Sequence, residues 1–152
     1  GFQRIILLKN GGTMSDSKPL MWTPKAGVGY IVTRRPDGGM TLTFSDLSEA
    51  TMADWREFAF EHLLGSDRLT RNLYDLRKVK EIPEKAIKMA VEVNNDPSTR
   101  NIRAAVVVAS EQVKEAIMKV AASATGTGAA LRVFSVLEEA EAWLAKPLDR
   151  MV

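Results

Sequence analysis

The chain has 152 residues, of which 45% are hydrophobic and 26% are charged, values typical of a single globular domain with its own core. Its longest apolar runs, such as residues 104–109, are far too short to span a bilayer, so no membrane span is expected. It contains no cysteine, which excludes disulfides and cysteine-ligated zinc and suits a reducing cytoplasm. The formal net charge is only +2 and cations alternate with acids, so no nucleic-acid partner is expected.

The two ends of the chain differ in character from the middle. Residues 1–27 are interpreted as an N-terminal arm, partly tag or flexible. The apolar run at residues 5–8 is too short for the core of a secretory signal. Met14 resembles a natural start. An α/β domain is predicted over residues 28–147, followed by a tail at residues 148–152.

The first predicted elements are a hairpin and a helix. Strands over residues 30–34 and 40–44 flank Asp37-Gly38-Gly39, which supplies the positive φ angles that a tight turn needs. A helix is predicted from about Ser48 to Leu64, with Asp46 and Glu49 at capping-box spacing.

Strands and helices then alternate to the end of the domain. Strands are predicted over residues 70–76, 103–109 and 130–134, and helices over residues 83–94, 111–122 and 136–145. Ser110 is expected to cap the second of these helices, and Ser135 with Glu138 the third. The unbroken apolar run of the 103–109 strand indicates a central strand buried on both faces. The order β-β-α-β-α-β-α-β-α predicts an α/β fold with a single, mostly parallel sheet and helices packed on it.

Three local segments resemble a known family. The segment RNLYDLR at residues 71–77 resembles a strand ending in an Asp-Leu-Arg turn, RAAVVV at 103–108 a central strand, and RVF at 132–134 with EEAEAWL at 138–144 a closing strand and helix. Over residues 28–145 the chain is similar to the SpoIIAA-like fold of STAS and STAS/SEC14-like bacterial domains. The resemblance implies a regulatory role. No Ser or Thr lies between Asp75 and Pro83, so the STAS phosphorylation switch is not expected.

No catalytic constellation is visible. His62 is the only histidine, and it has no evident partners for a metal site or a triad. The glycine loop at residues 125–128 lacks the lysine of a P-loop and lies between a helix and a strand rather than the reverse. We therefore predict a protein without metal or cofactor that is not an enzyme.

The carboxyl ends of the strands are the predicted place for a ligand, because ligands of open α/β sheets bind there. The candidate ligand-binding residues are Asp75, Arg77, Ser110 and Ser135. Ser110 and Ser135 are also explained as helix caps. Asp75 and Arg77 form either an internal salt bridge or a ligand contact.

The helix over residues 83–94 has an apolar arc of roughly 200°, where a surface helix needs only about 100°. Either the arm at residues 11–29 covers the excess or another chain does. The second reading predicts a partner surface made of Ala86, Met89 and Val93, with Arg77 and Lys78 beside it.

Two functions follow from these patterns. The first is a non-enzymatic regulatory or scaffold domain that binds a protein partner or a second copy of itself. The alternative is a carrier or sensor of a small apolar ligand, held between the sheet and the first helix near Trp55 and Phe58.

Overall fold

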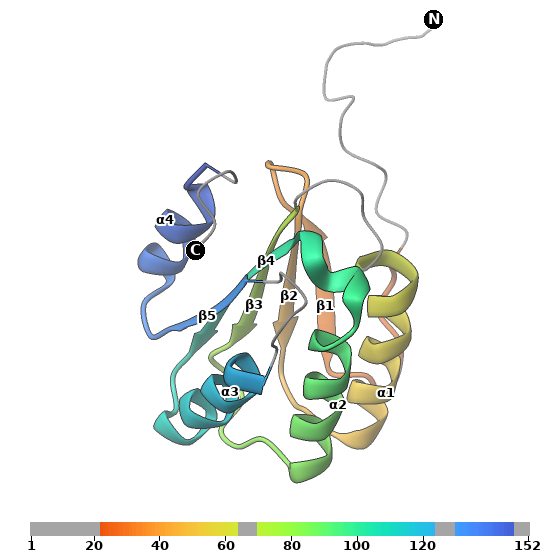
Figure 1. The fold of residues 1–152 in the computed structure, drawn as a ribbon. Coiled ribbons are helices and arrows are strands. Elements are labelled where there is room, and N and C mark those ends of the chain that lie inside the picture. The colour runs from red at the N-terminus through yellow and green to blue at the C-terminus, as the bar shows by residue number, and fades with distance from the viewer. Residues whose placement is uncertain (1–21, 64–69, 124–129, 148–152) are drawn as a thin grey trace, which may run out of the picture.

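The computed structural model describes residues 22–63, 70–123 and 130–147 (Figure 1). Five strands form one sheet in the order β1–β2–β3–β4–β5. The only antiparallel pair of this sheet is β1 with β2, and β2 to β5 run parallel. The strands are β1 (Tyr30–Arg34), β2 (Met40–Phe44), β3 (Thr70–Leu76), β4 (Ile102–Val108) and β5 (Ala130–Phe134). The predicted α/β class with a mostly parallel sheet is thereby confirmed.

The helices are divided unequally between the two faces of the sheet. In Figure 1, α1, α2 and α3 cover one face and α4 lies alone on the other. Successive crossovers between neighbouring parallel strands run in one direction across the sheet, so their helices fall on the same face. No helix in the described ranges has both the length and the apolar character that crossing a membrane requires. The helices are α1 (Glu49–Phe58), continued by a π-helical turn η2 (Ala59–Leu63), α2 (Glu84–Asn94), the 3₁₀ helix η3 (Pro97–Asn101), α3 (Glu111–Ser123) and α4 (Leu137–Ala145).

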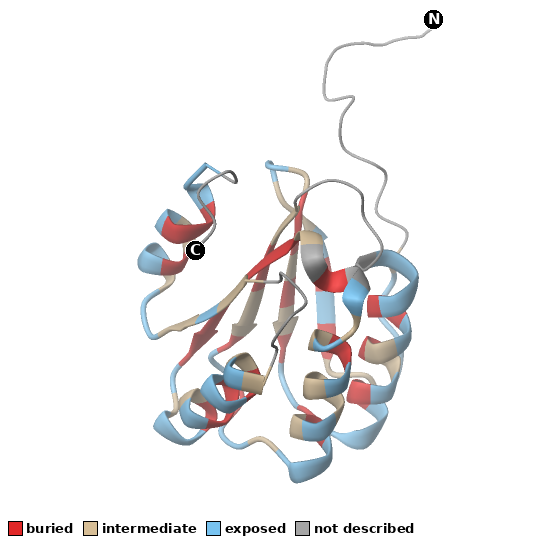
Figure 2. Cartoon of the chain, in the orientation of Figure 1, coloured by how far each residue is buried: buried red, intermediate tan, exposed pale blue. Residues whose placement is uncertain are grey.

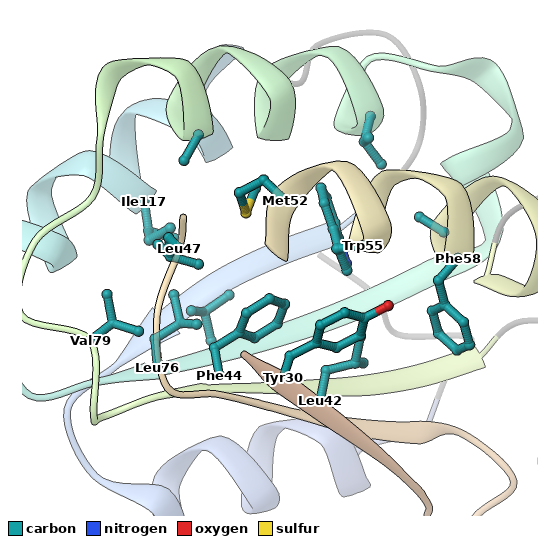
Figure 3. Close-up of a cluster of buried hydrophobic side chains, with 14 of the residues drawn as sticks. Tyr30, Leu42, Phe44, Leu47, Met52, Trp55, Phe58, Leu76, Val79 and Ile117 are labelled. Carbon is teal, nitrogen blue, oxygen red and sulfur yellow. The ribbon is translucent and has the colours of Figure 1, made fainter. Parts of the chain in front are cut away.

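Alternation along the strands builds two hydrophobic cores. In β3, Tyr74 and Leu76 pack toward α1–α3, whereas Leu73 packs under α4. All residues of β4 are buried, as the unbroken apolar run predicts. The strand lies between β3 and the edge strand β5, and the middle strand of the sheet is β3. Figure 3 shows the larger core between the sheet and α1–α3, and Figure 2 shows the buried side of each helix turned toward the sheet.

Two consecutive glycines shape the hairpin for different reasons. Gly38 has a φ of 92°, which side chains with a Cβ rarely adopt. A Cβ on Gly39 would overlap the backbone carbonyl of Arg71 on β3. The turn is closed by the N–H of Arg35, which donates to the Gly39 carbonyl oxygen at 2.8 Å.

The cap of α1 differs from the prediction. Ser48 is the N-cap, and its hydroxyl accepts from the N–H of Thr51 at 3.3 Å. The Asp46 carboxylate instead accepts from the N–H of Ser48 at 2.9 Å and from the Thr51 hydroxyl at 2.6 Å. Asp46 is therefore not the N-cap itself, and its carboxylate instead holds Ser48 and Thr51 in place.

Of the caps predicted for the last two helices, one is confirmed and one is wrong. Ser110 accepts from the N–H of Val113 at 3.4 Å, which confirms its predicted role at α3. The predicted capping box of Ser135 and Glu138 is wrong, because the N-cap of α4 is Val136, which provides no side-chain hydrogen bond.

Two arginines from the sheet hold the C-terminal end of α4. Arg103, which is 1% exposed, donates to the carbonyl oxygens of Trp143 at 3.1 Å, Lys146 at 2.8 Å and Pro147 at 3.1 Å. Arg71 donates to the carbonyls of Leu144 and Lys146. The last carbonyls of a helix have no intrahelical donors and carry partial negative charge, so the two guanidinium groups satisfy them.

Candidate functional site

A cavity of about 80 Å³ lies between the sheet and helices α1, α2 and α3. One buried water needs about 10–15 Å³ of such space, so the cavity offers room for about five to eight waters or a small molecule of comparable volume. Among the described residues that line it, none carries a charge. A cavity with such walls favours apolar contents over water.

Small side chains on facing elements explain why space remains here. Ala90 of α2 and Ala104 of β4 both line the cavity, as does Ala59 at the end of α1. In the sheet, Ala104 is flanked by Asn72 on β3 and Leu131 on β5. A larger residue at position 90 or 104 would reduce the free volume.

Aromatic rings form one wall. The rings of Phe44 and Tyr74, on neighbouring strands, stack with centroids 6.3 Å apart and planes at 17°. Trp55 meets the Tyr74 ring edge-on, with centroids 6.2 Å apart. Figure 3 shows Trp55 reaching from α1 toward the sheet, and Phe44 lying on the strand below. This packing fixes the position of the Tyr74 ring.

The aromatic wall carries the Tyr74 hydroxyl, whose proton meets no acceptor among the described residues. Trp55 Nε1 donates to the Tyr74 hydroxyl oxygen at 3.3 Å, and within the described ranges Tyr74 donates to no acceptor. Burial raises the pKa of Tyr74 to about 12, so the hydroxyl remains protonated at neutral pH.

Two other polar side chains of the cavity, those of Thr99 and Asn94, each donate to a backbone carbonyl. The Thr99 hydroxyl donates to the Asp96 carbonyl oxygen at 2.7 Å, and the Asn94 side-chain amide donates to the Ala90 carbonyl oxygen at 2.9 Å. The first bond lies in the connection between α2 and β4, and the second lies within the last turn of α2. The Tyr74 hydroxyl, by contrast, belongs to a ring held between two aromatic neighbours, so its position in the wall is fixed.

Three of the four predicted ligand residues at the strand ends make hydrogen bonds to nearby residues of the chain, and the fourth, Ser135, is exposed. The Arg77 guanidinium bonds both carboxylate oxygens of Asp75, at 3.0 and 2.8 Å, and holds the pKa of Asp75 below its ordinary value. The Ser110 hydroxyl donates to the Lys80 carbonyl oxygen at 3.2 Å, and Ser135 is exposed. This arrangement matches the internal salt bridge that the sequence left open for Asp75 and Arg77.

The predicted partner surface on α2 needs correction. Ala86 and Val93 are only 2% and 4% exposed, and Met89 packs against the same core. The reason is that α2 is the middle helix of three and packs against α1 on one side and α3 on the other. The wide apolar arc of α2 is thus buried or half-buried within the chain, and of the five predicted residues only Arg77 and Lys78 are exposed.

The other sequence features considered for chemistry were the single histidine, the glycine loop and a metal site. His62 is exposed in η2, with its ring 5.0 Å from that of Phe58. The glycine loop at residues 125–128 lies outside the described residues. Within the described ranges, no group of three His, Asp or Glu side chains is arranged to hold a metal ion.

Sequence reasoning found only part of the cavity. Trp55 lines it as the alternative hypothesis expected, whereas Phe58 lies in the core away from it. The sequence-based prediction did not include three other lining residues, Tyr74, Ala90 and Ala104. The signal present in the sequence was the placement of small residues inside strongly apolar segments, opposite large aromatic ones.

Comparison with known proteins adds no relatives. The chain matches no protein-family model, and no significant similarity to a curated protein or a solved structure was found.

Proposed function

We propose that this chain is a binding domain for a small apolar molecule, acting as a carrier or sensor rather than as an enzyme. The observation that carries the proposal is the uncharged cavity of about 80 Å³ between the sheet and α1–α3. Ligand sites are usually preformed, mostly apolar and equipped with few polar groups. The cavity described above has these properties.

The strand order supports a SpoIIAA-like arrangement for this domain. Strands β2 to β5 follow one another in chain order, and β1 is added antiparallel at one edge. The Asp-Leu-Arg turn at residues 75–77 lies after β3, where the resemblance expects it. The finer fold assignment is part of this proposal.

Binding of a protein partner is the second candidate function, because less of its support remains. Its main support was the wide apolar arc of α2, which α1 and α3 account for. What remains for it is the exposed pair Arg77 and Lys78, and Arg77 is already bonded to Asp75.

The proposal is tested by titrating the protein with cumene, an apolar molecule of one substituted ring. Amide shifts followed by NMR should change around Ala90, Ala104 and Leu131, and the melting temperature should rise with cumene concentration. Native mass spectrometry of protein from its own host should show a discrete added mass. An unchanged spectrum at saturating cumene would contradict the proposal.

A matched pair of variants locates the binding. Ala90→Met fills the cavity from α2 and should abolish cumene binding, whereas Ala53→Met at an exposed position of α1 should leave it unchanged. Circular dichroism checks that both variants fold. Equal affinity in the two variants would place the cumene site elsewhere.

A further inference from the structure

Tyr74, which lines the cavity, is a hydrogen-bond donor whose ring is fixed by its aromatic neighbours. The Tyr74 hydroxyl accepts from Trp55 Nε1 at 3.3 Å, and its ring is held between Phe44 and Trp55. Its own proton has no acceptor among the described residues. Tyr74 is half-buried in this apolar wall, and a bound molecule with an oxygen acceptor would give its hydroxyl proton a partner there.

We propose that the Tyr74 hydroxyl selects neutral ligands that carry one acceptor oxygen, such as a small ketone, aldehyde or ester on an apolar body. This inference rests on the proposed function and names its ligand class. The rigid setting of Tyr74 means that little freedom is lost when the hydrogen bond forms.

The walls also determine which acceptors are rejected. No described lining residue carries a positive charge that could compensate a carboxylate, and an unpaired charge in such a site is strongly unfavourable. The Thr99 hydroxyl and the Asn94 amide donate to backbone carbonyls. A neutral carbonyl is therefore favoured over both a carboxylate and a pure hydrocarbon.

Three probes of almost equal shape test this selection: acetophenone, α-methylstyrene and benzoate. In the wild-type protein, acetophenone and α-methylstyrene should bind and benzoate should not. Tyr74→Phe should weaken acetophenone binding by roughly 2- to 12-fold, the worth of one net hydrogen bond, and leave α-methylstyrene unchanged. Comparing the two probes in both proteins cancels their different solubilities in water.

An infrared measurement on the wild-type protein gives an independent readout of the hydrogen bond, and the Tyr74→Phe variant serves as its control. The carbonyl stretch of bound acetophenone should lie below its frequency in an alkane solvent, because a hydrogen bond weakens the C=O bond. In Tyr74→Phe the stretch should return to the alkane value. A bound carbonyl with the alkane frequency in the wild-type protein would overturn the inference.

The outcomes separate the two proposals. If both neutral probes bind and Tyr74→Phe affects them equally, Tyr74 only packs, and the selection is overturned while the binding function stands. If neither probe binds the wild-type protein, the selection and the binding function both fail. Tight binding of benzoate would overturn the selection alone.

Discussion

The guanidinium carbon of Arg103 lies 5.2 Å from the ring centroid of Trp143, and the same guanidinium donates to the carbonyl oxygen of Trp143 at 3.1 Å. One side chain of the sheet thus holds both the indole and the backbone at the end of α4. Burial, and then the nearby charge of Arg71, lowers the pKa of Arg103 below its ordinary value. The carbonyls that accept its hydrogen bonds are what make this buried cation tolerable.

Arg103→Lys should destabilise the protein by about 2–4 kcal/mol, because one ammonium cannot reproduce the fork of donors and buried carbonyls lose their partners. Arg132→Lys is the matched control. Arg132 is exposed and stacks on the rings of Phe134 and Trp143, so the loss should stay near 0.5–1 kcal/mol. Urea unfolding measures both. Equal losses would mean that the carbonyl contacts contribute little.

The cavity predicts opposite effects of one substitution at two adjacent positions of β4. Ala104→Val extends into the free space and should stabilise the protein by about 0.5–2 kcal/mol. Ala105→Val points the added methyl groups into the closely packed core under α4, where Ala105 is fully buried, and should cost about 1–3 kcal/mol. Chemical denaturation distinguishes the two. Destabilisation by both would show that the cavity is filled in solution.

The tyrosines should ionise late in the folded protein. Burial raises the pKa of Tyr74 from 10.0 to about 12, and burial with the bond to Asp54 also raises that of Tyr30. The native state holds these protons more tightly than the unfolded state, so their contribution is complete below pH 10 and is lost as the pH rises toward 12.

Phenolate absorbance against pH measures this directly. Little ionisation should occur in the folded protein at the pH where the urea-unfolded chain is half ionised. In Tyr74→Phe the remaining delayed signal belongs to Tyr30. Normal titration of both tyrosines in the folded wild type would refute the described burial.

The two turn glycines should respond differently to alanine. Gly38→Ala introduces a Cβ at a φ of 92° but into open space, which should cost about 1–2 kcal/mol. Gly39→Ala forces β2 away from the Arg71 carbonyl on β3 and should cost more, because the parallel pairing of Met40 with Asn72 lies next to it. Thermal unfolding ranks the two. A larger effect at Gly38 would contradict this geometry.

Local patterns predicted the elements well. The bounds of β1, β2, β3 and β5 were as expected, because turn glycines and short apolar runs mark them. The π-helical continuation of α1 over Ala59–Leu63 was predicted as ordinary helix, since its residues keep a helical apolar spacing.

Features that depend on packing between distant elements, such as the burial of α2 and the cavity, could not be predicted from the sequence. The width of an apolar arc does not reveal how many helices pack against it, so α2 was read as exposed when it is the middle of three. The cavity depends on Ala90 and Ala104 meeting across two layers with Tyr74 beside them. Each of these residues is ordinary in its own segment, and only the packed structure brings them together.

Since strands β1 to β5 lie side by side in the order of the chain, each unit emerging from the ribosome can dock on the one before it. Arg71 and Arg103 are then synthesised well before their acceptors. Until residues 143–147 emerge, both guanidinium groups lack the carbonyls that hold them in the folded protein. Completion of α4 is therefore the step that supplies acceptors to both guanidinium groups.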